Sequence, residues 1–286
     1  MRNYVFITPF VEEEFFLDVR KGIDDAAKML RVKADFVGDK GCDFDVLNGL
    51  LKKSVAEGID GIALNIIDPY RFNEATEVAM EKGIPIVAFN TDVREGGNMR
   101  LSGVAQNFFE AGKSAGMRAA RKLPKGAKVL CTLHDSDTYP LEKRLEGIRA
   151  GLGAGFTVSV LVTGNTPQLA AESVYDYLKK DGETTGIVGT GQSDTEGSGM
   201  AAQRIGRPVY VAGFDTSPRI LDMVATGIVD FTIDQQPYLQ GFYPLLQLHH
   251  WAEYRLAPDN IDVGNAMIDS SNCEEIADAR KRLADG

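Results

Sequence analysis

The chain alternates short apolar runs with longer segments of helical periodicity along its whole length. Each apolar run is rich in Val, Ile, Phe and Ala, which is typical of a strand covered on both faces. Strands that alternate with helices in this way predict parallel sheets wrapped by helices. The expected strands are residues 4–8, 33–37, 61–65, 85–90, 101–105, 128–133, 157–162, 185–190, 209–214, 229–234 and 264–268. The expected helices are residues 14–30, 45–57, 71–82, 108–123, 141–152, 167–180, 195–205, 218–226, 238–255 and 274–283.

This alternation is interrupted after Asn90, where residues 91–98 are polar and carry glycine. A second set of strands and helices follows, which predicts two similar lobes in tandem. We therefore expect an α/β fold of two Rossmann-like lobes with parallel sheets, joined by a three-stranded hinge. The expected lobes are residues 1–102 plus 236–262 and residues 103–235 plus 263–286. Crossings near Ser102, Gln235 and Asp262 would make a hinge that bends but resists twisting, which suits closure around a ligand.

Composition and charge exclude several classes of function. The 286 residues carry a net charge of −10, and an acidic surface repels nucleic-acid phosphates. No apolar run approaches the ~20 residues that cross a bilayer. The cysteines, Cys42, Cys131 and Cys273, are odd in number and far apart, and no metal-ligand spacing occurs. We therefore expect no disulfide framework, no metal and no other cofactor.

The N-terminal residues enter the first expected strand at once, without the pattern of a signal peptide. This leaves open a cytoplasmic protein and a mature extracytoplasmic form whose leader was replaced by an initiator Met.

Polar side chains follow nearly every expected strand. In open parallel sheets, ligands bind at the carboxyl ends of the strands, where loops and helix N-termini meet. Any one of these side chains is consistent with a simple helix N-cap, but eight such ends from two lobes favour a binding site. Amides and carboxylates pair with adjacent hydroxyls, and the aromatic rings of Phe15 and Phe16 suit the C–H face of a sugar ring.

Apparent catalytic motifs fail for physical reasons, so no catalytic residue is expected. Residues 112–114 (Gly-Lys-Ser) lack the first glycine of a phosphate loop, because Asn107 stands there. Residues 112–116 match G-x-S-x-G, but Ser114 falls about two turns into an expected helix rather than on a strand-to-helix turn. His249 and His250 are helix neighbours that point in different directions.

Several segments together resemble a known family. Residues 213–218 (Gly-Phe-Asp-Thr-Ser-Pro) and 231–237 (Phe-Thr-Ile-Asp-Gln-Gln-Pro) are accompanied by Glu-Phe-Phe at 14–16, Gly-Ile-Pro-Ile-Val at 83–87 and Arg-Leu-Glu-Gly at 144–147. In order and spacing the chain resembles a type I periplasmic sugar-binding protein, of the ribose-binding branch that serves ABC transporters. The resemblance implies a monomeric periplasmic or extracytoplasmic protein that captures a monosaccharide or polyol between its lobes and delivers it to a membrane permease.

The strand-end pattern and the resemblance together give the expected ligand-binding residues. They are Glu13, Phe15, Phe16, Asn65, Asn90, Asp92, Gln106, Asp137, Glu142, Ser193, Asp194, Asp215 and Gln235. Ribose binders usually carry Asp-Arg where this chain has Asn90 and Thr91, and Arg where it has Glu142. The loss of two guanidinium groups argues against ribose, and the surplus of acidic side chains disfavours an anionic sugar phosphate. Arg144 is expected to play a structural part near the pocket floor.

Other functions remain open from the sequence. A sugar-sensing regulator core shares this fold, but its DNA-binding segment of ~60 residues has no room before the strand expected from Tyr4. A chemoreceptor-coupled sensor would use the same lobes. A sugar hydrolase or isomerase would use Glu142 or Asp215 in an acid–base pair.

Overall fold

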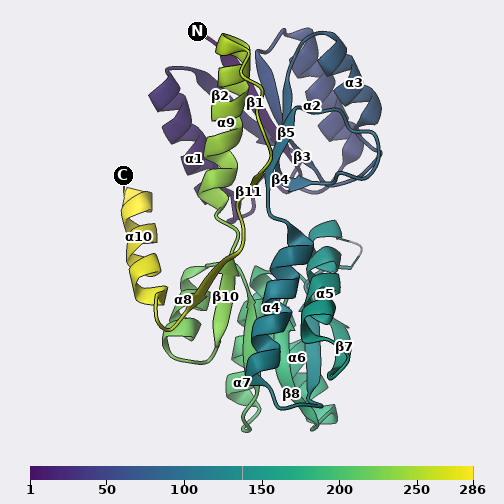
Figure 1. The fold of residues 1–286 in the computed structure, drawn as a ribbon, viewed down its shortest axis with the longest axis vertical. Coiled ribbons are helices and arrows are strands. Elements are labelled where there is room, and N and C mark those ends of the chain that lie inside the picture. The colour runs from purple at the N-terminus through teal and green to yellow at the C-terminus, as the bar shows by residue number, and fades with distance from the viewer. Residues whose placement is uncertain (137, 286) are drawn as a thin grey trace. The chain divides into compact units, whose positions relative to one another are not determined.

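The computed structural model describes residues 1–136 and 138–285, and the chain divides into two compact units (Figure 1). The first unit holds Met1–Gln106 and Gln236–Val263, and the second holds Asn107–Gln235 and Gly264–Gly286. The chain therefore passes from one unit to the other three times. Strand β5 (Ser102–Ala105) pairs with β4 (Ile86–Asp92) in the first sheet, which places residues 103–106 in the first unit rather than the second.

The first unit is a six-stranded, fully parallel sheet in the order β11-β5-β4-β3-β1-β2. Its remaining strands are β1 (Asn3–Thr8), β2 (Lys33–Gly38), β3 (Gly61–Ile66) and β11 (Ile261–Asp262). Its helices are α1 (Phe16–Leu30), α2 (Phe44–Ala56), α3 (Asn73–Glu81) and α9 (Pro237–Tyr254). Every residue of β3 is buried, as expected for a strand covered on both faces. Helix α2 begins where the Asp43 carboxylate accepts hydrogen bonds from the backbone N–H groups of Asp45 and Val46.

The second unit repeats this plan with the sheet order β12-β10-β9-β8-β6-β7. Its strands are β6 (Lys128–Leu133), β7 (Thr157–Val162), β8 (Thr184–Gly189), β9 (Tyr210–Phe214), β10 (Phe231–Asp234) and β12 (Ala266–Asp269). Its helices are α4 (Phe108–Lys122), α5 (Tyr139–Leu152), α6 (Pro167–Lys180), α7 (Gln192–Arg204), α8 (Pro218–Ala225) and α10 (Cys273–Asp285). Strand β12 is antiparallel to β10, whereas the other pairs are parallel. The two sheets confirm the α/β fold class predicted from the alternation of strands and helices.

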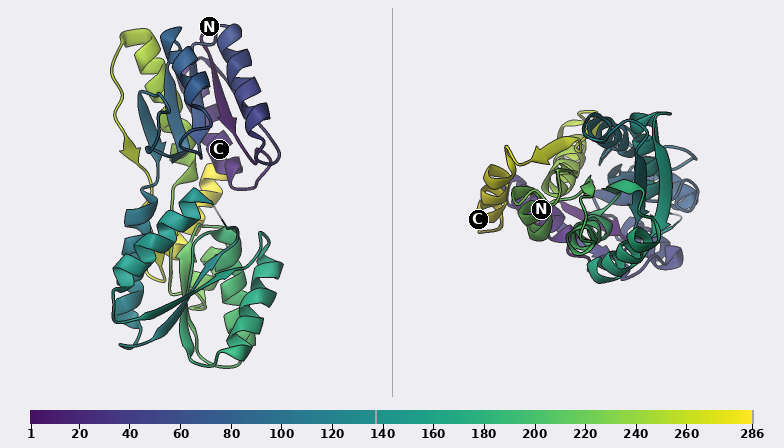
Figure 2. Two further views of the ribbon diagram at one scale, coloured as in Figure 1. Left: turned by 90° about the vertical axis from the view of Figure 1, so that its right-hand side faces the viewer. Right: turned by 90° about the horizontal axis from the view of Figure 1, so that it is seen from below.

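Hydrophobic cores form on both faces of the second sheet, and alternate residues of one strand serve each face. In β6, Val129 and Cys131 pack toward α4 and α5, whereas Leu130 packs toward α6, α7 and α8. Figure 2 shows helices on both faces of this sheet. In the first unit, α1 and α9 cover one face together. Covering both faces explains why the strands are continuous apolar runs in the sequence.

Helices α4 and α5 pack so closely that glycine is required at their contact. A Cβ placed on Gly112 would lie 2.2 Å from the carbonyl oxygen of Arg144, and one on Gly147 would lie 2.1 Å from that of Phe109. The G-x-S-x-G letters at 112–116 therefore belong to a helix–helix contact inside α4, as their helical position predicted.

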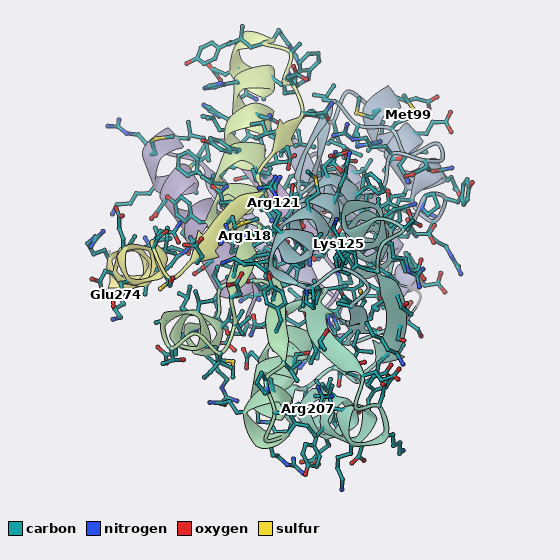
Figure 3. The ribbon with its side chains drawn as sticks, turned by 60° about the horizontal axis from the view of Figure 1, so that its bottom comes forward. Met99, Arg118, Arg121, Lys125, Arg207 and Glu274 are labelled. Carbon is teal, nitrogen blue, oxygen red and sulfur yellow. The ribbon has the colours of Figure 1, made fainter. Side chains whose placement is uncertain are left out.

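Arg118, labelled in Figure 3, is a charged side chain in the C-terminal part of α4 that contacts the last strands. Nη2 of Arg118 donates to Oδ2 of Asp269 at 2.7 Å, and the guanidinium lies 5.6 Å from the centre of the Phe231 ring. This bond joins α4 to β12, so the antiparallel strand is held from two sides. Among the residues that the structure describes, no helix is both long enough and apolar enough to cross a membrane.

Candidate ligand-binding site

Each sheet has a polar residue in the left-handed backbone region near the carboxyl end of one of its inner strands. Strands β4 and β9 hold the same place, third in the order of their sheets. Asn90 in β4 has φ 62°, and Asp215 directly after β9 has φ 76°. Asn and Asp tolerate this conformation better than other residues with a side chain, so they suit these two positions. We call these two regions the first edge and the second edge.

The first edge is organised by the buried amide of Asn65 at the end of β3. Its Nδ2 donates to Oγ1 of Thr8 at 2.9 Å and to Oδ1 of Asn90 at 3.0 Å. Its Oδ1 accepts the backbone N–H of Thr91 at 3.2 Å. Asn65 thereby joins the ends of β1, β3 and β4, and its hydrogen-bonding capacity is used inside the first unit.

Asn90 continues this network toward helix α9. Its Nδ2 donates to Oε1 of Gln240 at 2.9 Å, and Gln240 is fully buried. Asn90 itself is half-buried rather than enclosed. The structure thus brings the predicted residues Asn65 and Asn90 together.

The aromatic pair at the start of α1 divides its roles. Phe16 is 4% exposed, and its ring packs on Phe36 and Phe15 in the hydrophobic core. Phe15 is half-buried and packs against the same core. Glu13 is exposed in the loop after β1. Of the pair, Phe15 has more accessible ring surface for a ligand.

Asp92 and Gln106 are both buried in the first unit. The Asp92 carboxylate is ion-paired with Arg100 and with Nε of Arg94, the latter at 3.1 Å. Its Oδ2 also lies against the backbone of Gly103 in β5, because a Cβ there would be 2.3 Å away. These contacts direct Asp92 toward its own loop and β5.

The second edge carries a paired carboxylate and amide. Nε2 of Gln235 donates to Oδ1 of Asp215 at 2.5 Å, and both side chains are buried. The backbone N–H of Asp215 donates to the carbonyl of Ile233 at 2.9 Å, which fixes the residue against β10. Burial raises the pKa of Asp215, and the charge of Arg144 and the Gln235 hydrogen bond oppose this shift.

Arg144, from α5, is the buried cation of the second edge. Its guanidinium lies 4.4 Å from the centre of the Phe214 ring and 5.3 Å from that of Phe108. Nη1 donates to the carbonyl of Thr190 at 2.8 Å. Burial lowers the pKa of Arg144, and the negative charges of Asp215 and Asp194 oppose this shift.

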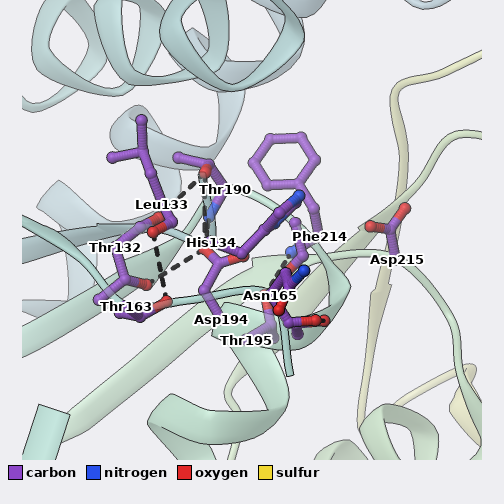
Figure 4. Close-up of polar contacts among 12 residues, drawn as sticks. Thr132, Leu133, His134, Thr163, Asn165, Thr190, Asp194, Thr195, Phe214 and Asp215 are labelled. Atoms are coloured by element: carbon purple, nitrogen blue, oxygen red, sulfur yellow. Dashed lines mark hydrogen bonds and ion pairs between the residues drawn. The ribbon is translucent and has the colours of Figure 1, made fainter. Parts of the chain in front are cut away.

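Asp194 holds the loops of the second edge together (Figure 4). Its Oδ2 accepts the backbone N–H of Thr190 at 2.6 Å and the hydroxyl of Thr132 at 3.2 Å. Its Oδ1 lies 3.1 Å from Nδ1 of His134, and because a carboxylate only accepts, this nitrogen donates. Asp194 is fully buried, so it holds the second edge in place without being exposed at its surface.

The remaining predicted residues of the second unit lie in less enclosed places. Glu142 is exposed in the first turn of α5. Ser193 is half-buried, and its hydroxyl donates to the carbonyl of Asn165 at 3.2 Å. Asp137 lies outside the described residues. Within the described ranges, no three His, Cys, Asp or Glu side chains are grouped to hold a metal ion.

Comparison with known proteins identifies the family. Residues 4–253 match the family described as a periplasmic binding protein domain. The chain belongs to this family.

Similar proteins include a sugar-binding protein, a carbohydrate transporter and a solute-binding protein. The chain is 27% identical over 287 residues to the xylose/arabinose-binding protein XylF of Sulfolobus acidocaldarius, an alignment that covers 94% of this chain and 71% of XylF. A carbohydrate transporter of Acidothermus cellulolyticus 11B, solved with myo-inositol, is 24% identical with a TM-score of 0.86 and covers 99% of both chains. A solute-binding protein of Burkholderia graminis C4D1M, solved with D-arabinose, is 21% identical with a TM-score of 0.87 and covers 95% of this chain and 96% of that one. At these identities the two solved structures show the shared fold.

In this periplasmic binding protein, several residues of the two edges escape prediction from the sequence. Gln240, Thr8, Thr132 and Thr190 hold the predicted side chains in place but are not among the expected ligand-binding residues. Gln240 carries a usable signal, because it is a single polar residue between Leu239 and Gly241 on a helix that packs against the sheet. A buried amide at such a position needs a polar partner. The threonines carry no such signal.

Proposed function

We propose that this chain is a solute-binding protein that captures a neutral monosaccharide or cyclic polyol for uptake by an ABC transporter. The observation that carries the proposal is the Asp215–Gln235 pair beside Arg144 at the carboxyl end of a parallel sheet. A carboxylate and an amide held side by side match two adjacent hydroxyls. The family and the similar proteins, which include a xylose/arabinose-binding protein and proteins solved with D-arabinose and with myo-inositol, support the same class of ligand.

The charges of the second edge favour a neutral ligand. Arg144 is a single buried cation, and Asp215 and Asp194 both lie close enough to act on its pKa. Two carboxylates beside one guanidinium leave no excess positive charge for a phosphate or carboxylate group. A sugar or polyol supplies hydroxyls that both donate and accept, which suits this mixed set of groups.

We propose a division of labour among the predicted residues. Asp215, Gln235, Asn90 and Phe15 contact the sugar, with Phe15 against its apolar face. Asn65, Asp194 and Arg144 support these groups from behind.

The biological setting follows from the family. We propose that the chain acts as a monomer outside the cytoplasm and passes its ligand to a membrane permease. Binding rather than catalysis is its role, because Asp215 is paired with an amide and Glu142 is exposed in the solvent. Micromolar affinity corresponds to about −8 kcal/mol, which is within reach of a monosaccharide with about a dozen heavy atoms.

A sugar panel tests the proposal. D-xylose, D-arabinose, L-arabinose, D-ribose and myo-inositol are each added to the purified chain, and the melting temperature is recorded. A ligand at about 100 times its Kd stabilises the folded form by about 2.7 kcal/mol, which raises the melting temperature by several degrees. Asp215→Ala is expected to abolish this shift while the chain remains folded. An unchanged shift in Asp215→Ala contradicts the site, and conversion of the sugar, seen by chromatography, contradicts a binding role.

A further inference from the structure

The amide network of the first edge has a fixed direction, because one member can only donate. The backbone N–H of Thr91 meets Oδ1 of Asn65 at 3.2 Å, so the oxygen of that amide must face Thr91. Nδ2 of Asn65 then faces Oδ1 of Asn90 at 3.0 Å. This leaves Nδ2 of Asn90 facing Oε1 of Gln240 at 2.9 Å. A single backbone group thereby sets the orientation of three amides in sequence.

This orientation decides what Asn90 has left to offer a ligand. Its Oδ1 accepts from Nδ2 of Asn65 and, at 3.4 Å, from the hydroxyl of Thr91, which uses both lone pairs. Its Nδ2 carries two hydrogens, and one of them goes to Gln240. Within the described part of the chain, the second hydrogen has no acceptor, and Asn90 is half-buried rather than enclosed. Asn90 therefore has a hydrogen-bond donor to spare and no acceptor.

Gln240 holds this arrangement from the side of helix α9. Its side chain is fully buried, so the hydrogen bond to Asn90 is not in exchange with solvent. With Asn65 on one side and Gln240 on the other, the Asn90 amide is restrained at both of its ends. Removing Gln240 would leave the nitrogen end of the amide without a restraint.

We infer that Gln240 is a positioning residue for ligand specificity, which holds the Asn90 amide so that its N–H faces the bound sugar. This inference rests on the proposed sugar-binding function. It requires that the sugar oxygen at Asn90 accept a hydrogen bond. A ring oxygen or an ether oxygen satisfies this requirement as well as a hydroxyl does. A sugar that has no oxygen at this position does not satisfy it. Asn90 and Gln240 would then select ligands that place a hydrogen-bond acceptor opposite the N–H of Asn90.

Helix α9 supplies a matched control. Gln247, seven residues after Gln240, accepts from the Ser102 hydroxyl at 2.7 Å and donates to the carbonyl of Asp259 at 2.8 Å. Gln240→Met and Gln247→Met each remove a glutamine that bonds across the first unit. A purely structural role predicts that both lower the melting temperature and that neither changes sugar binding.

The test measures Kd by calorimetry for D-xylose, D-arabinose, D-ribose and myo-inositol, together with melting temperatures without sugar. Gln240→Met is expected to weaken the best-binding sugar by about fivefold to tenfold and to change the ratio of affinities across the panel. Gln247→Met is expected to keep Kd within about twofold. Asn90→Asp keeps the shape of the side chain but offers only acceptors, and it loses the hydrogen bond to Oε1 of Gln240. This variant is expected to fold and to bind at least tenfold more weakly.

The outcomes separate the inference from the proposed function. If the wild-type chain binds none of the four sugars, the proposed function fails and the inference falls with it. If the wild type binds and Gln240→Met keeps the wild-type Kd, as Gln247→Met does, the inference alone is overturned. Wild-type affinity in Asn90→Asp overturns it equally.

Discussion

The two edges share one backbone design and carry opposite chemistry. Asn90 and Asp215 lie near the carboxyl ends of equivalent strands with left-handed backbone conformations, and each accepts a hydrogen bond from an amide of another element. The first edge is built from neutral amides around Asn65. The second edge is built from buried charges, Arg144 with Asp215 and Asp194. The fold therefore determines where the polar groups lie. The residue type at each position determines the free-energy cost of burying the group and how its charge responds to pH.

This difference predicts which edge depends more on its partners. Removing one side of a neutral amide pair leaves an unsatisfied group, which costs about 1–3 kcal/mol. Removing Arg144 leaves the buried carboxylates of Asp215 and Asp194 without their counter-charge, which costs about 3–5 kcal/mol. The single tryptophan, Trp251, lies in α9 of the first unit, so its fluorescence reports unfolding of that unit, whereas circular dichroism reports both. The two signals let the edges be compared in one chain.

Arg144→Met is expected to have the largest effect. It removes the guanidinium that bonds Thr190 and offsets the charges of Asp215 and Asp194, at a cost of about 3–5 kcal/mol in the free energy of unfolding. In urea titrations, the circular dichroism transition should move to lower urea while the Trp251 transition changes less. Arg149→Met, at an exposed position of the same helix, is the control. Equal stability of the two variants would contradict the role of Arg144 as a buried counter-charge.

Asp194→Asn is expected to cost somewhat less, about 2–3 kcal/mol. The change turns one acceptor oxygen into an N–H₂ group, although Thr190, Thr132 and His134 all donate to this carboxylate. Thermal unfolding followed by circular dichroism measures the loss. Asp176→Asn, on the exposed side of α6, should leave the melting temperature within about 1 °C. A loss of similar size in both variants would mean that Asp194 is not the centre of the second edge.

Asn65→Ala tests the neutral edge and is expected to cost about 1–2 kcal/mol. The variant leaves the backbone N–H of Thr91 and the Oδ1 of Asn90 without their Asn65 partner. Because none of these groups titrates, the loss should be the same at pH 5 and pH 8, as read from Trp251 fluorescence in urea. Asn48→Ala removes hydrogen bonds to the carbonyls of Phe44 and Arg71 at a less buried place, and it should cost less. A loss that grows with pH would show that the first edge is not electrically neutral.

Much of this architecture can be predicted from the sequence. The alternation of apolar runs and helical segments predicts the confirmed two-sheet fold, because strands buried on both faces leave a continuous apolar signature. The pairing of Asp215 with Gln235 is also within reach, since both follow adjacent strands. The strand ends lie at the same edge of the sheet, and the patterns of apolar and polar residues locate these ends well in the sequence.

The direction of individual side chains is harder to predict. Phe15 and Phe16 are neighbours in the sequence, yet Phe16 enters the core, because the turn of α1 decides which ring faces inward. Asp92 is drawn into its own loop by Arg94 and Arg100, and loop conformations leave little trace in periodicity. Gln240 reaches Asn90 across 150 residues of sequence, so their contact emerges only once α9 is packed on the first sheet.

Asp215→Asn is expected to have the smallest effect on stability and the clearest pH signature. Burial raises the pKa of Asp215, so the folded chain binds more protons at this group than the unfolded chain does. The stability contributed by Asp215 is therefore greatest below its unfolded pKa of about 4, and it falls as the pH rises through the folded value.

Asparagine keeps an oxygen for Nε2 of Gln235 but carries no charge. Asp215→Asn should thus match the wild type in acid and be more stable than the wild type at pH 8, in urea titrations followed by circular dichroism. Its sugar affinity should fall, because the carboxylate acceptor is gone. If the variant is instead less stable than the wild type at pH 8, the attraction of Arg144 for the Asp215 carboxylate outweighs the cost of burying it. The charged edge would then be a net source of stability rather than a cost borne for binding.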